Sequence, residues 1–417
     1  MSLVISRARL LDPASNTLFA VPAIAISLFV FAYSTIYGQK AILVFYALWF
    51  PLLLLAPERL IVNRGPILFV LLVPAFATLS VLWSDTPATT LRASIQYGTT
   101  VLCGLIAARV VSVRSLTTGG MIGGFVILLY SHNDGTFAYD YLDASYALQG
   151  AFNSKNQLGS FAALTAFLAV AFTVRSGTPL VLRALAGAVA VFAVWTLIRS
   201  DSATSAIAIL AGLFTALVVL GMMRIGIGAR AQSIVIVLCI AMGLAALAAF
   251  VGALDTVFAV FGKDSTLTGR TFLWSMGLLF GEERPLLGLG YYAFWVHNRP
   301  EAEDLWLVFY ITARTGFHFH NTLVESFVAL GLVGTALVGS WMVALVVSVF
   351  RVSMNTGRRA EAAICAGLAV NFFIRAGVEI DFFTPYTLGS FLVPYLIVQM
   401  SDARHATLAR HMRAVPS

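Results

Sequence analysis

Cationic and histidine side chains gather in one mixed, aromatic stretch of an otherwise apolar chain, from about Asp255 to His320. Arg270 opens a short apolar run in this stretch, and His320 stands where the chain enters the next long apolar run. A guanidinium presents a planar fork of N–H donors that matches the oxygens of a phosphate. An imidazole titrates near neutral pH and can act as a general base. These residue types predict a site that handles an anionic substrate.

Four short motifs follow one another around this stretch. They are Gly269-Arg270-Thr271-x-x-Trp274, Arg284-Pro285-Leu286-Leu287-Gly288-x-Gly290, His320-Asn321 and Gly331-Leu332-x-Gly334. The first predicts a short interfacial helix from Thr271 to Phe280, which the Arg-Pro pair ends. The glycines that follow permit a tight turn in which backbone N–H groups come close to a ligand. The structural alternative is an arginine paired with Asp264 or Glu282 beside an ordinary turn.

Other ionisable residues have both a functional and a structural interpretation. Lys155 opens an apolar run, where it either contacts a phosphate or snorkels to the membrane surface. Glu325 is a carboxylate in a predicted span and functional by default, or it pairs with Arg314 or Arg375. Arg375 and Glu379 are four residues apart, which predicts an intrahelical ion pair.

No metal or cofactor is predicted. His318 and His320 form a His-x-His pair, but no clear third ligand lies near them in the sequence, and zinc usually takes three or four protein ligands. Acidic clusters that would hold magnesium are missing. Cys103, Cys239 and Cys365 lie in separate apolar runs, without the spacing of a metal site or a disulfide framework, and are predicted to pack.

The composition requires a membrane. Of 417 residues, 59% are hydrophobic and 11% are charged, whereas a soluble domain has about 25% charged residues. Apolar runs of spanning length predict an all-α polytopic membrane protein; a β-barrel would need short alternating segments. The predicted spans are 18–35, 41–56, 66–82, 93–108, 119–131, 157–174, 179–197, 204–222, 232–252, 322–350, 361–377 and 384–400.

The basic residues orient these spans. With the N-terminus in the cytoplasm, every predicted inside connection carries at least two basic residues, as the positive-inside rule expects. Both termini are therefore predicted to be cytoplasmic, and the net charge of +7 reflects orientation rather than binding to nucleic acid. The predicted organisation is nine spans in residues 1–252, an external loop at 253–320, three spans in 321–400 and a basic tail at 401–417.

Taken in order, the motifs resemble the signature of the O-antigen ligase and exopolysaccharide polymerase family of polytopic glycosyltransferases. The resemblance covers roughly residues 78 to 335 and includes three upstream elements: Trp83-Ser84-Asp85-x-Pro87 with Leu91-Arg92, Phe152-x-x-Lys155-Asn156-x-Leu158-Gly159, and Ser200-Asp201-Ser202. One departure is Ala203, where family members often have a basic residue. Whether the preceding Arg199 supplies that charge is open.

The resemblance implies a bundle of about twelve transmembrane helices, similar to membrane glycosyltransferases of the C superfamily, with short helices in a large periplasmic loop. It implies undecaprenyl-diphosphate-linked oligosaccharides as donor and acceptor at the periplasmic face of the inner membrane, with no metal. His320 then accepts the proton of the acceptor hydroxyl, and Arg270 stabilises the leaving diphosphate. The other implied substrate-binding residues are Arg92, Lys155, Arg199, Arg284, His318, Asn321 and Glu325.

The favoured function is polymerisation of lipid-linked repeat units, because the Trp-Ser-Asp and Leu-Arg elements look more like the exopolysaccharide polymerase branch. Expected partners are the lipid bilayer, a chain-length co-polymerase and a flippase. The alternative within the family is a ligase that transfers finished glycan to lipid A-core. A transporter is the alternative from another class, but its ionisable residues would lie at mid-membrane, whereas here they cluster at the external face.

Overall fold

The structure, a computed structural model, describes residues 7–58, 62–140, 145–226, 228–230, 232, 269–354 and 359–414. The predicted ninth span, apart from residue 232, lies outside the described residues. So do Lys263, Asp264 and the remainder of the external loop up to residue 268.

Helices dominate the described residues, which confirms the all-α polytopic fold. Seven of the described helices are long and apolar enough to cross a membrane: α2 (Thr17–Leu55), α4 with the short helix η1 (Arg64–Leu79 and Ser80–Leu82), α6 (Val113–Asp134), α7 (Lys155–Thr173), α8 (Leu180–Arg199), α9 (Ala203–Met222) and α14 (Thr322–Ser353). Three others coincide with predicted spans but are more polar: α5 (Pro87–Val110), α15 (Arg359–Ala376) and α16 (Leu388–Ala414).

The remaining elements are short: α1 (Arg7–Leu11), α12 (Arg270–Gly281), α13 (Pro300–Val308) and the strands β1 (Phe137–Asp140) and β2 (Ser145–Leu148). Helix α12 confirms the predicted interfacial helix to within a residue at each end. The strands pair antiparallel in a hairpin that the sequence did not predict, because four residues are too few to show a clear alternating pattern.

Helix α2 folds back on itself and therefore contains two predicted spans. The chain leaves helical geometry at Tyr33 and again at Gly38. In a straight helix, Phe19 and Trp49 would lie about 45 Å apart, at about 1.5 Å per residue. Their ring centroids are 6.2 Å apart instead. The two halves are antiparallel, which confirms the first two predicted spans as separate helical segments.

Helix α14 is interrupted at Gly331, and the Arg-Pro turn of the external loop fills the interruption. Gly331 has φ 64° and ψ −166°. Four backbone hydrogen bonds join the two segments: Leu289 N to Val328 O (3.0 Å), Gly290 N to Ala329 O (2.9 Å), Leu332 N to Pro285 O (2.8 Å) and Val333 N to Leu286 O (3.3 Å). A Cβ atom at Gly331 would lie 2.3 Å from backbone of Leu286. Only glycine permits this approach.

The Trp-Ser-Asp element at 83–85 also binds the turn at residues 285–290. Trp83 Nε1 donates to the carbonyl of Leu287 at 2.9 Å, and the Asp85 N–H donates to the carbonyl of Leu289 at 3.2 Å. The Asp85 carboxylate pairs with Arg284 at 2.8 Å. Two motifs that are about 200 residues apart in sequence thus build one scaffold.

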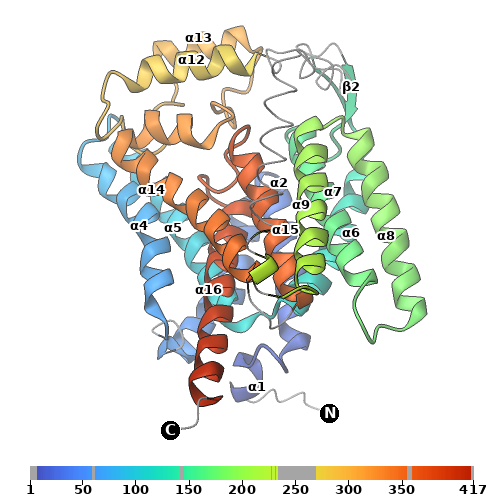
Figure 1. The fold of residues 1–417 in the computed structure, drawn as a ribbon. Helices are drawn as coiled ribbons and strands as arrows, with labels where there is room; N and C mark the ends of the chain where they lie inside the picture. Colours follow the sequence, from blue (N-terminus) through green and yellow to red (C-terminus); the bar gives the residue numbers. More distant parts are fainter. Residues whose placement is uncertain are drawn as a thin grey trace.

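Helices α12 and α13 lie across one end of the bundle, the loop end, and both chain termini lie at the opposite, terminal end (Figure 1). A small hydrophobic cluster fixes the short helices and is separate from the main core among the spans; it includes Leu273, Phe280, Phe294, Trp306 and Phe319. Helices α9 and α15 pack closely, since a Cβ atom at Gly212 would lie 2.7 Å from the carbonyl oxygen of Gly367. The ends of these two helices meet α12 at the candidate site.

Candidate functional site around Glu379

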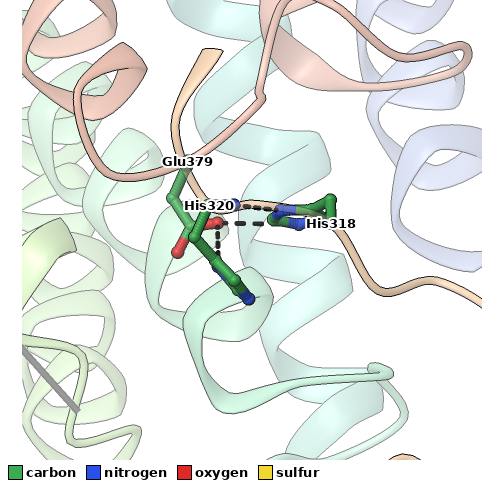
Figure 2. A group of neighbouring side chains, drawn as sticks. All are labelled: His318, His320 and Glu379. Atoms are coloured by element: carbon green, nitrogen blue, oxygen red, sulfur yellow. Dashed lines mark hydrogen bonds and ion pairs between the residues drawn. The ribbon is translucent and has the colours of Figure 1, made fainter. Parts of the chain in front are cut away.

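Glu379 lies at the centre of a cluster of charged side chains at the loop end. Its Oε1 is 2.9 Å from Nη2 of Arg270, and its Oε2 is 3.3 Å from Nδ1 of His320. Nε2 of His318 lies 3.9 Å from the same Oε2, so both imidazoles face one carboxylate (Figure 2). The Glu379 side chain is 8% exposed. Arg270 and His320, the two residues with predicted chemistry, therefore meet at a single buried acid.

Separate segments hold this carboxylate and its arginine. Arg270 is the first residue of α12, and its Nη1 donates to Oγ1 of Thr204, in the first turn of α9, at 3.3 Å. Glu379 follows the end of α15, where its N–H donates to the Arg375 carbonyl at 2.7 Å. Its own carbonyl accepts a hydrogen bond from the Thr322 hydroxyl at 2.7 Å. The acid is thus fixed through its backbone as well as its side chain.

The histidines lie on the segment that leads into α14, and that segment is anchored at both ends. Asn321 caps the helix, since its Oδ1 accepts the N–H groups of Leu323 and Val324, and its Nδ2 donates to the carbonyl of Gly377 at 2.9 Å. As a result, the start of α14 is tied to the loop that carries Glu379.

The imidazoles are oriented by the backbone between them. Phe319 is fully buried, and its N–H donates to Glu325 at 2.8 Å. The His320 N–H donates to Nδ1 of His318 at 3.0 Å. His320 has φ 50°, a left-handed conformation that costs a non-glycine residue energy and clusters at functional sites. The surrounding contacts therefore dictate where this ring points.

The charges of the cluster fix its ionisation. Burial alone would raise the pKa of Glu379, but His320, Arg270 and His318 together hold it well below its ordinary value. Burial, then the neighbouring His320 and Arg270, hold the pKa of His318 well below its ordinary value, against the opposing influence of Glu379. Near neutral pH, Glu379 is therefore a carboxylate and His318 a neutral ring. An ionised Glu379 accepts the Nδ1 proton of His320, which leaves Nε2 as the basic nitrogen.

The same three side chains offer donors that suit a divalent metal. One atom each from His318, His320 and Glu379 lies within 4.8 Å of the others. The sequence did not suggest a third ligand for the histidine pair, and Glu379 is that missing candidate. A cation there would lie beside the Arg270 guanidinium, which already occupies the other carboxylate oxygen. Because Arg270 already balances the charge of Glu379, its guanidinium would repel a cation bound there.

A second buried ion pair supports the first. Arg375 pairs with Asp381, with Nη2 3.0 Å from Oδ1, and its Nη1 donates to Ser205 Oγ at 2.9 Å. The predicted ion pair between Arg375 and Glu379 is wrong. Although the Glu379 N–H still donates to the Arg375 carbonyl, each side chain has a different partner: Asp381 for Arg375 and Arg270 for Glu379.

Lys155 and the Ser-Asp-Ser element meet beside the first turn of α9. Lys155 Nζ is 3.5 Å from Oδ2 of Asp201. Ser202 donates to Oδ1 of Asn156 at 3.1 Å. Two upstream motifs therefore converge on the helix end whose Thr204 contacts Arg270.

Three predicted site residues do not contact the cluster around Glu379. Arg284 pairs with Asp85 in the scaffold of the Arg-Pro turn. The Arg199 guanidinium lies over the ring of Phe137, 5.0 Å from its centroid. Arg92 is exposed near the start of α5, and its side chain has no hydrogen bond or ion pair with any described residue.

Glu325 pairs with neither of the arginines proposed for it. Its carboxylate accepts the N–H of Phe319 and lies 3.4 Å from Nε1 of Trp295. Arg314 instead pairs with Glu303 at 3.1 Å. Glu325 thus holds the backbone between His318 and His320 in place through Phe319.

Comparison with known proteins identifies a matching family and a similar protein. A family described as O-antigen ligase matches residues 186–339, which include Arg270, His318 and His320. The exopolysaccharide production protein ExoQ of Rhizobium meliloti is 39% identical over 413 residues, which cover 98% of this chain and 93% of that protein.

Proposed function

Because this chain belongs to the O-antigen ligase and exopolysaccharide polymerase family, we propose that it polymerises lipid-linked oligosaccharide repeat units. The family supports a ligase- or polymerase-type glycan transfer by a multi-pass membrane protein. The specific reaction that we propose moves a growing glycan from undecaprenyl diphosphate to a hydroxyl of the next unit. The observation that carries the proposal is the convergence of Arg270 and His320 on Glu379.

In this reaction, the acceptor oxygen attacks the anomeric carbon of the donor sugar. The bond from that carbon to the diphosphate breaks, and the hydroxyl proton passes to Nε2 of His320. Glu379 holds the opposite nitrogen of the ring and stabilises the imidazolium that forms, in the way a buried carboxylate supports a catalytic histidine. The carrier leaves as its diphosphate.

The leaving diphosphate needs positive charge near the membrane surface. Arg270 supplies it as a fixed guanidinium, since preorganised donors act strongly in a water-poor site. The N–H groups in the first turn of α9 add the positive end of a helix dipole. Lys155, beside the same turn, is the second phosphate contact that we propose. With these cations in place, the mechanism needs no metal.

We favour a polymerase over a ligase because the relative that is 39% identical is named for exopolysaccharide production. A ligase would deliver finished glycan to lipid A-core. Deletion of the gene separates the two: loss of a polymerase leaves single-repeat products, whereas loss of a ligase leaves full-length glycan on its carrier.

The proposed setting is the periplasmic face of the inner membrane, with both termini in the cytoplasm. It agrees with a loop end opposite the termini (Figure 1). A flippase would supply the lipid-linked units, and a chain-length co-polymerase would act on the same growing glycan. A transport function has less support, because the family match concerns glycan transfer.

Reconstitution in liposomes with a lipid-linked repeat unit tests the proposal. Arg270→Ala and His320→Ala are expected to slow extension by about 100-fold or more, typical of losing an electrostatic or acid–base catalyst. Arg314→Ala is the matched control, because its ion pair with Glu303 lies outside the cluster. A chelator is expected to leave the rate unchanged. Folded Arg270→Ala and His320→Ala proteins that both extend glycan at the wild-type rate would refute the assignment.

A further inference from the structure

A cavity of about 290 Å³ opens between the end of α7 and the start of α8. Helix α7 starts at the loop end with Lys155, so its far end and this cavity belong to the terminal end of the bundle, on the opposite side from Glu379. Its lining includes Phe172, Arg175, Ser176, Thr178 and Leu182, together with Arg114 from the first turn of α6. Two guanidiniums and two hydroxyls thus share a space with two apolar side chains.

The positive charge in this cavity is uncompensated. Among the described residues, no carboxylate lines it, and neither Arg114 nor Arg175 has an ion pair or a side-chain hydrogen bond. Burial, then the charge of Arg114, lower the pKa of Arg175, which reflects the electrostatic cost of the arrangement. Arg183 adds a third charge, since its Nη2 donates to the Arg175 carbonyl at 3.1 Å, while its buried Nε has no hydrogen-bond partner. An anion in the cavity would offset this repulsion.

The surroundings indicate what kind of anion fits. Val174, Val181 and Leu185 are 70%, 70% and 58% exposed, as expected for side chains that face hydrocarbon. The cavity lies between the ends of two apolar helices, α7 and α8, and therefore at the predicted membrane surface on this side. A soluble phosphate would use the guanidiniums but leave this apolar rim without a partner.

We propose that the cavity binds an anionic phospholipid, with the headgroup phosphate on Arg114 and Arg175 and the acyl chains along the exposed apolar face of α8. The chemistry recognised is a phosphodiester in a lipid surface. The site is independent of the glycan-transfer site and does not rest on its assignment.

The test compares the purified full-length protein in nanodiscs of phosphatidylcholine with and without phosphatidylglycerol. The variant is Arg114→Gln with Arg175→Gln. The control is Arg64→Gln with Arg224→Gln, which removes the same charge from two exposed arginines at the same end but outside the cavity. Retained phosphatidylglycerol is counted by native mass spectrometry, and lipid-induced stabilisation is read as a shift in Tm.

The cavity variant is expected to bind phosphatidylglycerol about tenfold or more weakly than wild type, and to lose most of the Tm shift, while the control keeps both. If the two double variants lose lipid binding and the Tm shift equally, the effect comes from overall charge rather than from the cavity, and the proposal is overturned. Stabilisation by inorganic phosphate alone, without lipid, would assign the cavity to a soluble anion and also overturn it. If the cavity variant does not fold, Ser176→Trp tests the site with both charges kept, and it should likewise abolish retention.

Discussion

Arg270 and Arg284 of the predicted external loop each pair with a carboxylate from another segment, at nearly equal distances but in different surroundings. The Arg270–Glu379 pair measures 2.9 Å, with side chains 13% and 8% exposed. The Arg284–Asp85 pair measures 2.8 Å, with side chains 46% and 33% exposed. Glu379 also faces two imidazoles, whereas Asp85 is shared with a second arginine, Arg299, at 3.4 Å.

The two pairs differ in whether water can hydrate a charge that loses its partner. An exposed ion pair contributes about 0–1 kcal/mol, because solvent screens it and hydrates either partner left alone. Breaking a buried pair costs about 3–5 kcal/mol, because the remaining charge has no compensation. Under the proposed reaction, a phosphate that enters the buried site would take the place of the carboxylate on Arg270. We therefore expect chemistry at the buried pair and scaffolding at the exposed pair.

The largest expected effect is a loss of glycan extension when Arg270, rather than Arg284, is replaced by lysine. Arg270→Lys keeps the charge but loses the planar fork, so extension of a lipid-linked glycan should fall by about 100-fold. The measurement is the initial rate in liposomes, normalised to folded protein. An Arg270→Lys enzyme with more than half of the wild-type rate would show that charge alone suffices. The functional distinction between the Arg270 and Arg284 pairs would then lose its support.

The next effect concerns the scaffold and should appear in stability. Gly331→Ala must place a side chain at φ 64° against the Leu286 backbone, and a strained residue of this kind costs about 1–3 kcal/mol. We expect a lower Tm and less folded protein, with nearly normal activity per folded molecule. Gly339→Ala is the control on the same helix, because its Cβ would meet only a leucine methyl at 3.8 Å. Equal Tm values for the two variants would contradict the role assigned to the interruption.

Glu379→Gln should lower the rate by about tenfold, through loss of the charge that supports the His320 imidazolium. Its pH dependence has a definite sign. Because the pKa of Glu379 is below its ordinary 4.5 in the folded protein, the unfolded chain binds the proton first as pH falls. The Tm advantage of wild type over the variant should therefore be complete above about pH 4.5 and shrink below it. An advantage that grows on acidification would contradict the ionised assignment.

The smallest effect is expected at the exposed pair. Arg284→Lys retains a charge opposite Asp85, so the rate should change by no more than about threefold and Tm by a degree or two. If this variant instead loses activity as severely as Arg270→Lys, Arg284 contacts the substrate, and the division between buried and exposed pairs fails.

Within the described residues, the predicted spans coincide with helices, because apolar runs of spanning length report lipid contact directly. It also placed Arg270 and His320 in one site, although this came from a family resemblance rather than from spacing. It missed the central role of Glu379, which was expected to pair with Arg375 four residues earlier. That rule holds only when neither side chain has a better partner, whereas here Arg270 pairs with Glu379 and Asp381 pairs with Arg375. Which distant carboxylate meets an arginine depends on tertiary packing, and nothing local in the sequence reports it.

The interruption of α14 makes the turn at residues 285–290 part of the helix bundle. Residues 285–290 are bonded into the helix by four backbone hydrogen bonds, which the bilayer interior cannot replace. We therefore expect this turn to be rigid rather than to open and close. If the chain is the polymerase proposed above, this turn is expected to keep its shape while the glycan lengthens, and any movement that admits the next unit must come from other segments.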